Sequence, residues 1–360
     1  MNYKKLTLLF CILSWTLSSI GQGEVYDEKK LSRSYVATKG SYVELSNRYG
    51  DIEIVPWAKD SVKIQVVIRT YSEKYDWRQT MMESIHVDFT RTSGFIIAET
   101  NWKEDASIWR KSTYNVSKEL GSNRIEVNYK VYLPATIPLE ISNKFGNVFM
   151  GSHDGELDIV VQHGDFRARD LKNVKRLEVR YGKVKVKSIT KGQIDLGSGS
   201  SLDLDEGGDI MLSSSSSEIE IDEVATLNVT SRHDDIFVNV LDKVYGSFNL
   251  SDLKIGTLNK ELRASTKFGT LRVMQVAQGA ERVSIDGSKT QVILGLAPGF
   301  SGRFDLDVDG EGELSLPKDM NVAKRAVTED KRLSVQGTMG AQGGTIVSIS
   351  SASGFVQIGD

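Results

Sequence analysis

Short segments in which apolar and polar residues alternate recur along most of this chain. Such alternation is the pattern of a β-strand with one buried face. The phrase Val43-Glu-Leu-Ser-Asn-Arg-Tyr-Gly-Asp-Ile-Glu-Ile54 returns, little changed, as Leu139-Glu-Ile-Ser-Asn-Lys-Phe-Gly-Asn-Val-Phe-Met150. Weaker copies follow it. Counted from Leu139, the first seven starting positions are separated by steps of 18, 20, 17, 16, 17 and 21 residues. The weaker copies start at Leu157, Leu177, Ile194, Ile210, Leu227, Phe248, Leu262, Val283 and Phe304.

The repeat predicts an all-β fold. A strand of three to five residues is unstable alone in water, but stacked copies bury their apolar faces as one continuous core. We therefore expect a single-stranded β-solenoid, that is a parallel β-helix, from about residue 136 onward. Parallel crossovers are nearly always right-handed, so the coil should be right-handed. An antiparallel sandwich or barrel also has many short strands and is the competing fold.

A glycine divides the two half-strands of several repeats, and a ring-bearing residue precedes it. Glycine enters positive φ without steric cost, so we expect these glycines to hold that conformation at tight corners. Equivalent residues of neighbouring turns lie about 4.8 Å apart, close enough for the rings to stack in a column. The glycines are Gly50, Gly146, Gly164, Gly182 and Gly269, and the residues before them are Tyr49, Phe145, His163, Tyr181 and Phe268.

The N-terminal part departs from the repeat. A longer alternating strand covers residues 62–68, and Ser72 could cap a short helix with Trp77, Met81 and Ile85 on one face. Further strands are expected before Pro134, with a polar loop over residues 103–123. We therefore expect the first turn plus a small sheet-and-helix insertion over residues 22–135, and the solenoid over residues 136–360.

Residues 1–21 have the features of a secretory signal peptide. Lys4 and Lys5 precede a short apolar stretch, and small residues follow it. The alternative is an uncleaved N-terminal anchor. Cys11 is the single cysteine and lies inside the apolar stretch, so the mature chain would contain no disulfide. No later segment has 18 consecutive apolar residues, so we expect no membrane-spanning segment after cleavage.

The charges narrow the range of partners. The chain of 360 residues has 45 basic and 48 acidic side chains, a net charge of −3, and no basic stripe. Nucleic-acid binding proteins carry a basic patch or stripe, so we expect no nucleic-acid partner.

Three stretches resemble a known family. These are SNRYGDIEI, VNYKVYLPATIPLEISNKFGNVFM and the final SSASGFVQIGD. They are similar to the bacterial cell-envelope family known as "putative adhesin", a domain of unknown function. In that family a strand ends in a V-x-L-P or V-x-V-P step and a G-[DN]-[VI] corner follows, positions held here by Val131 to Pro134 and by Gly146 to Val148. The resemblance covers about residues 40–360. It implies an exported β-helix and supplies no catalytic residues.

The sequence contains no convincing catalytic or metal-binding motif. Its histidines, His86, His153, His163 and His233, lack metal-ligand spacing. An alternating acidic row from Asp305 to Glu313 could collect Ca²⁺, but a solvated strand face explains it better. Carbohydrate-active β-helix enzymes use paired acids in a cleft, and Asp158, Asp195 and Asp203 are the nearest candidates.

We therefore expect a non-enzymatic module without a cofactor, located in the periplasm, on the cell surface or outside the cell. Its partner would be an envelope protein or a glycan. The first alternative is a polysaccharide lyase or hydrolase, and the second is a periplasmic scaffold or sensor partner of a membrane signalling protein.

The signal peptide gives the first prediction. The exported chain should have lost about the first 21 residues, because the short apolar stretch and the small residues after it are typical of a cleaved signal. Intact-mass spectrometry of the exported protein measures this, and a mass that still includes Met1 would contradict it.

Overall fold

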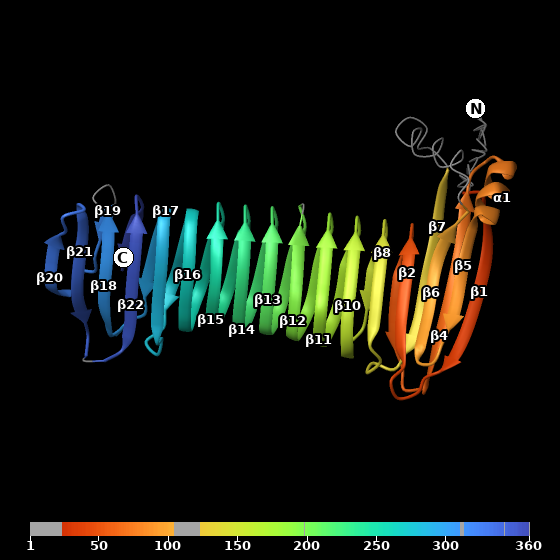
Figure 1. The fold of residues 1–360 in the computed structure, drawn as a ribbon, viewed down its shortest axis with the longest axis horizontal. Coiled ribbons are helices and arrows are strands. Elements are labelled where there is room, and N and C mark those ends of the chain that lie inside the picture. The colour runs from red at the N-terminus through yellow and green to blue at the C-terminus, as the bar shows by residue number, and fades with distance from the viewer. Residues whose placement is uncertain (1–23, 104–122, 198, 310–312, 342, 360) are drawn as a thin grey trace, which may run out of the picture.

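The computed structural model describes residues 24–103, 123–197, 199–309, 313–341 and 343–359. These residues form an elongated stack of strands, with the N-terminal strands and the helix at one end and β20 and β21 at the other (Figure 1). Most neighbouring strands in the middle of the stack are parallel. The protein is thus an all-β protein whose long, mostly parallel sheet is consistent with a solenoid.

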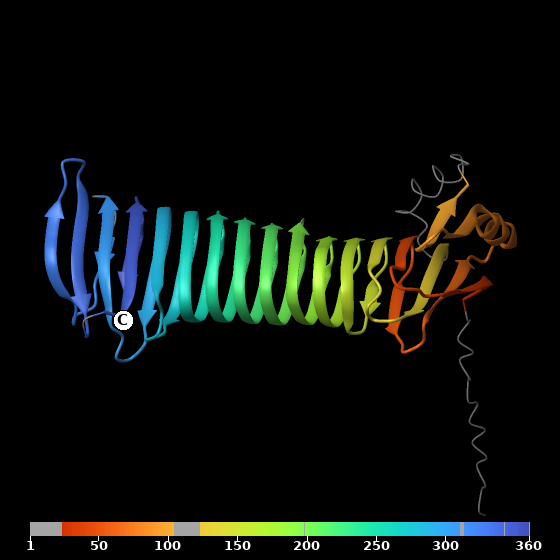
Figure 2. The same cartoon turned by 60° about the horizontal axis from the view of Figure 1, so that its bottom comes forward.

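Six long strands form the middle of the stack, and each bends as it crosses the molecule (Figure 2). Ser201 of β13 lies opposite Lys183 of β12 and opposite Glu218 of β14, so one step along the stack is 18 or 17 residues of chain. This is the repeat length that the sequence shows. The strands are β11 (Phe166–Arg180), β12 (Lys183–Gly197), β13 (Ser201–Ser215), β14 (Glu218–Arg232), β15 (Asp235–Asn249) and β16 (Asp252–Val276).

The core runs the length of the stack as columns of apolar side chains. Parallel pairing in constant register puts equivalent residues directly above one another, about 4.8 Å apart. Fully burying one Val, Leu or Ile contributes about 1.5–3 kcal/mol. One such column contains Leu202, Ile219, Ile236 and Leu253, all at most 3% exposed.

The first turn of the repeat is separated from the second in sequence but adjacent to it in space. β2 (Tyr42–Arg48) and β3 (Ile52–Pro56) pair in parallel with β8 (Leu139–Lys144) and β9 (Val148–Met150). β10 (His153–Gln162) continues the stack from β8. The residues between β3 and β8 therefore form an insertion between two neighbouring turns.

The insertion caps the N-terminal end with antiparallel pairs. β4 pairs with β1 and β7, and β5 pairs with β6. β6 and β7 join the stack through parallel contacts with β2 and β3. The elements are β1 (Tyr26–Val36), β4 (Ser61–Tyr71), α1 (Tyr75–Ser84), β5 (Ile85–Arg91), β6 (Phe95–Trp102) and β7 (Arg124–Leu133).

The expected short helix is present, but its expected cap is not. Lys74 is the N-cap residue and makes no side-chain capping bond. The Ser72 hydroxyl instead accepts a hydrogen bond of 3.1 Å from the Lys74 backbone N–H, before the helix begins. Met81 is buried as expected, and the Ile85 side chain is buried from β5, after the helix has ended. Residues 104–122 of the expected polar loop lie outside the described part of the chain.

At the other end, the C-terminal strands insert into the stack. β22 pairs in parallel with both β17 and β18, and β23 lies between β17 and β19. The antiparallel strands β20 and β21 close this end. The strands are β17 (Arg282–Leu296), β18 (Gly302–Asp309), β19 (Glu313–Ser315), β20 (Asn321–Val327), β21 (Arg332–Met339), β22 (Thr345–Ala352) and β23 (Phe355–Ile358).

The expected conformation of the corner glycines is wrong for four of the five. Positive φ belongs to the residue before the glycine, for example 65° at Tyr49, 59° at Phe145 and 57° at Tyr181. Gly269 does hold a φ of 117°. The other four, Gly50, Gly146, Gly164 and Gly182, are outside the positive-φ region.

Close approach between turns explains these glycines. A Cβ added to Gly164 would overlap the carbonyl oxygen of Gly146, and one added to Gly182 would overlap the carbonyl oxygen of Gly164. Because the overlapping atom belongs to backbone, it has no flexible side chain to move away. The glycine is therefore required by the contact with the preceding turn and not by its own dihedral angles.

This packing gives the second prediction. Gly164→Ala should lower the free energy of unfolding by about 1–3 kcal/mol, because the new methyl group forces two paired strands apart. Gly279→Ala is the matched control, since Gly279 has ordinary φ and no atom within 4 Å of the added Cβ. Chemical denaturation of both variants measures the difference, and equal losses would contradict the close-approach explanation.

Candidate interaction surfaces

One residue per turn adopts the left-handed conformation and forms a line along the stack. From Phe145 to Phe268 these residues are 17 or 18 positions apart, and Gly199 holds the place of one of them with a φ of 72°. We call this line the corner edge. Left-handed backbone costs a non-glycine residue about 1–2 kcal/mol, so the stack must compensate for it at each turn. The corner edge comprises Tyr49, Phe145, His163, Tyr181, Gly199, Ser216, His233, Leu250, Phe268, Lys289 and Ser353.

Stacked rings occupy the first part of the corner edge. Ring centroids are 5.3 Å apart for Tyr49 and Phe145, 4.9 Å for Phe145 and His163, and 4.6 Å for His163 and Tyr181, with planes within 12° of parallel. The predicted column of Phe145, His163 and Tyr181 is therefore confirmed. Trp102 of the cap contacts Tyr49 edge-on at 5.6 Å.

Phe268 lies on the same edge but outside this column. Gly199, Ser216, His233 and Leu250 separate it from Tyr181. Its ring lies instead near two ammonium groups, with Lys267 Nζ at 5.7 Å and Lys289 Nζ at 5.6 Å from the centroid.

Acidic and amide side chains next to the corner glycines link the first turns together. Asp51 Oδ1 accepts a 2.8 Å hydrogen bond from the Asn147 backbone N–H. Asn147 Oδ1 accepts one of 2.9 Å from the Asp165 backbone N–H. Asp165 Oδ1 in turn accepts a hydrogen bond of 3.0 Å from the Lys183 backbone N–H. Sequence alone did not indicate this link between turns, because bonding to the next turn depends on the register.

Farther along the stack, the residue that follows the corner-edge residue in sequence is, in several turns, a small polar residue instead of glycine, and its side chain points inward. Asp234 is 2% exposed and accepts hydrogen bonds from the hydroxyls of Ser214 (2.7 Å) and Ser231 (2.6 Å) and from the backbone N–H groups of Ser217 and Arg232. Four donors thus surround one buried carboxylate. The sequence did not reveal this network, because no local pattern indicates that Asp234 points into the interior.

The network gives the third prediction. Asp234→Ala should lower the free energy of unfolding by about 2–3 kcal/mol, because it leaves buried hydroxyl and amide donors without an acceptor. Asp235→Ala removes an exposed carboxylate at the next position and should change stability by less than about 0.5 kcal/mol. Thermal unfolding of the two variants measures the difference in stability. Similar small losses of stability in both would contradict the role assigned to Asp234.

A groove opens in the corner edge just past the ring column. It has a volume of about 830 Å³, and we call it the Tyr181 groove. Its charged lining residues are Asp165, Lys183, Glu218 and Asp235, and the rest of the lining is dominated by serine, glycine, Tyr181 and His233. At neutral pH the groove therefore carries more negative than positive charge.

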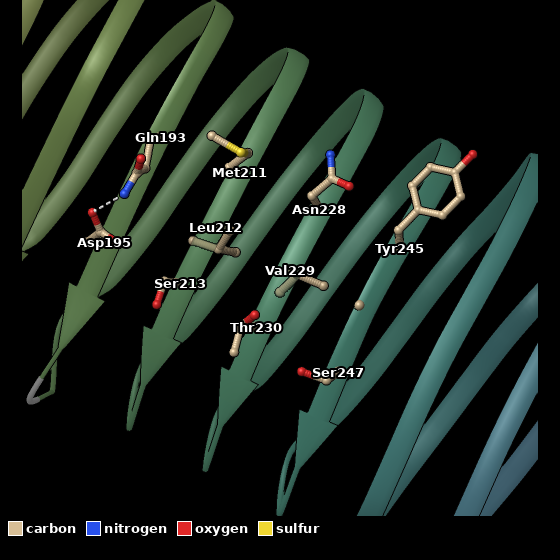
Figure 3. Close-up of a pocket in the computed structure, with 11 residues that line it drawn as sticks. Gln193, Asp195, Met211, Leu212, Ser213, Asn228, Val229, Thr230, Tyr245 and Ser247 are labelled. Atoms are coloured by element: carbon tan, nitrogen blue, oxygen red, sulfur yellow. Dashed lines mark hydrogen bonds between the residues drawn. The ribbon is translucent and has the colours of Figure 1, made fainter.

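A second, smaller depression of about 460 Å³ lies on the outer face of β12 to β15. Figure 3 shows two rows of outward side chains here, one with Gln193, Met211, Asn228 and Tyr245 and one with Asp195, Ser213, Thr230 and Ser247. At its end the Tyr245 hydroxyl donates a 2.6 Å hydrogen bond to Glu261, which lowers the pKa of that carboxyl. The depression is open to solvent, and its lining mixes polar side chains with the apolar Met211, Leu212 and Val229.

The histidines occupy separate places. His163 is part of the ring column, as expected, and His233 lines the Tyr181 groove. His153 is buried, its Nε2–H donates to the Ile137 carbonyl at 2.9 Å, and burial lowers its pKa. Within the described residues, no group of three or more His, Cys, Asp or Glu side chains is arranged to hold a metal ion.

The acidic residues considered for calcium and for catalysis are engaged elsewhere. Asp305 and Asp307 point outward from β18, where Asp307 pairs with Arg332 at 2.8 Å, while Phe304, Leu306 and Val308 are buried. This arrangement confirms the strand-face interpretation for the described part of the row. Of the possible catalytic acids, Asp158 pairs with Arg176 at 2.7 Å, Asp203 pairs with Lys185, and Asp195 accepts a hydrogen bond from Gln193.

In the part of the chain that the structure describes, no helix is long and apolar enough to cross a membrane.

The chain is similar to several solved bacterial structures. One is described as a putative adhesin from Bacteroides fragilis (11% identity, 75% of this chain and 97% of that chain, TM-score 0.36). Another is a putative adhesin from Parabacteroides distasonis (12% identity, 74% and 97%, TM-score 0.39). A third, from the same species, is described as a putative lipid binding protein (11% identity, 92% and 97%, TM-score 0.28). No protein-family model and no curated protein matches the sequence. Structures described as putative adhesins are thus among those that the chain resembles.

Proposed function

We propose that this protein is a non-enzymatic, exported interaction module of the cell envelope, with an adhesin-like role. The observation that carries the proposal is the ring column on the corner edge. Phe145 and Tyr181 are 39% and 55% exposed, yet each ring is held in register by its neighbours at about 5 Å. Rigid exposed aromatic side chains are typical anchors of binding surfaces.

The architecture that we infer for this module is a right-handed, single-stranded β-solenoid over residues 136–360. The steps of 17 and 18 residues between parallel partners support one coil per repeat, and the general handedness of parallel crossovers supports the right-handed coil. Residues 22–135 supply the first turn and the cap, and residues 1–21 direct export and are removed. Such a rod displays the same edge at every turn, which suits binding to an extended partner.

The surroundings of the acidic residues favour binding over catalysis. Glycoside hydrolysis needs two carboxyl groups facing one scissile bond, with one pKa raised so that it donates a proton. Asp158 and Asp203 instead pair with basic side chains. The pKa of Glu261 is lowered by its hydrogen bond from Tyr245, the opposite of what a general acid needs.

The fourth prediction separates binding from catalysis. The exported mature protein should bind isolated envelope polysaccharide or envelope protein without changing it. Co-sedimentation measures binding, and assays for new reducing ends and for unsaturated sugar products measure turnover on the same samples. Heat-unfolded protein is the control for non-specific adhesion.

Two results would contradict the proposal. Accumulation of reducing ends or unsaturated products would establish the enzyme alternative. Absence of binding to every envelope fraction would remove the interaction role.

A further inference from the structure

The ring column stops abruptly at Tyr181. On one side its ring stacks on His163 with parallel planes. On the other side the next position of the corner edge is Gly199, which has no side chain, and the one after it is Ser216. Within the described residues, Tyr181 has no second ring partner, and it is 55% exposed. The second face of this ring therefore borders the Tyr181 groove.

The groove has room for a ring that would continue the column. His233 is three turns beyond Tyr181, a separation of about 14 Å at the spacing of paired strands. The two turns between them contribute only Gly199 and Ser216 to the corner edge, and an atom added at the Cβ position of Gly199 meets nothing within 4 Å. A flat ligand lying on Tyr181 would fill the place that side chains occupy in the earlier turns.

The polar lining indicates which flat ligand suits the groove. The carboxylates of Glu218 and Asp235 accept hydrogen bonds, and the hydroxyls of Ser201 and Ser216 both donate and accept them. A purely aromatic ligand would leave these groups without partners. A sugar ring presents C–H groups to the aromatic face and hydroxyl groups to the polar lining, and thus satisfies both.

The charged residues of the lining indicate which net charge the ligand should have. Three carboxylates and one ammonium line the groove, and one of these carboxylates, Asp165, pairs with Arg167 at 3.3 Å. An anionic sugar or a phosphate would be repelled by the carboxylates. The lining therefore favours an uncharged saccharide over an acidic one.

We propose that the Tyr181 groove binds a neutral saccharide, with one pyranose ring stacked on the open face of Tyr181. This inference rests on the proposed binding function and names the class of partner for this one surface.

The fifth prediction tests the groove with defined probes. Chitotriose, cellotriose and maltotriose are the neutral probes, trigalacturonate is the acidic probe, and trilysine represents a basic peptide. Isothermal titration calorimetry of the exported mature protein should detect binding of at least one neutral trisaccharide. The affinity should depend little on salt concentration. Trigalacturonate and trilysine should bind at least about tenfold more weakly.

Variants locate the binding. Tyr181→Ala should lower the affinity for the neutral trisaccharide at least about tenfold. Tyr181→Phe keeps the ring face, so its affinity should stay within about threefold of that of the unchanged protein. Phe268→Ala is the matched control, because Phe268 holds the same left-handed position on the corner edge but lies outside the ring column and does not line the groove, so affinity should be unchanged. Gly199→Tyr should block the groove, because Tyr181 and Tyr49 show that tyrosine adopts this left-handed backbone. Thermal unfolding of each variant shows that it is folded.

Several outcomes would overturn the inference. Failure of all three neutral probes to bind would exclude a neutral saccharide, and equal affinity of Tyr181→Ala would place the binding elsewhere. Strong, salt-sensitive binding of trilysine would instead identify a basic peptide as the ligand. Each of these results leaves the envelope-binding test intact, so failure of the groove is distinguishable from failure of the proposed function.

Discussion

The structure depends on hydrogen bonding between successive parallel turns in a constant register. Ser201 lies between Lys183 and Glu218, and the same 17- or 18-residue step holds from β12 to β15. Because equivalent residues are then directly superposed, each position of the repeat becomes a column with its own chemistry, either apolar, aromatic or polar. A change at one residue acts on the residue above and on the residue below it. For this reason the close contact with the Gly146 carbonyl imposes glycine at position 164, and the close contact with the Gly50 carbonyl imposes glycine at position 146.

The corner edge shows how one backbone geometry serves two kinds of packing. In the first turns the residue after the corner is glycine, the preceding turn lies very close, and rings stack outside it. In later turns this residue is Ser200, Ser217 or Asp234, and the polar side chain enters the interior. The interior bonds around Asp234 then take over the role of the outer ladder of Asp51, Asn147 and Asp165. The Tyr181 groove lies where the first arrangement changes into the second, since the ring column ends there and Gly199 follows.

Much of the fold was predictable because its repeat is local. Alternation around Val43 and Leu139 predicted paired strands, and the ring before each glycine predicted the column of Phe145, His163 and Tyr181. The error about Gly50, Gly146, Gly164 and Gly182 has a physical cause. Positive φ and close approach both select glycine, and only the position of the neighbouring backbone distinguishes them. The buried network of Asp234 includes contacts 17 and 20 residues apart, and the return of β22 pairs residues 64 apart, which no local pattern reports. The groove was missed for a similar reason, because it is defined by where the column stops.

A stack of paired strands has open edges at both ends, and an open edge can recruit further strands. Each end of this chain carries features that oppose such growth. β1 is a highly charged outer strand, with an ion pair between Lys30 and Glu28. β20 carries Lys324 and Arg325, and its pairing with β21 is interrupted by a bulge next to Val322. Charged edge strands and bulges are known means of preventing edge-to-edge association. β22 is inserted between β17 and β18, so this strand cannot detach without breaking pairing on both of its sides. The length of the rod, and with it the spacing between the ring column and Phe268, is therefore set by the chain itself.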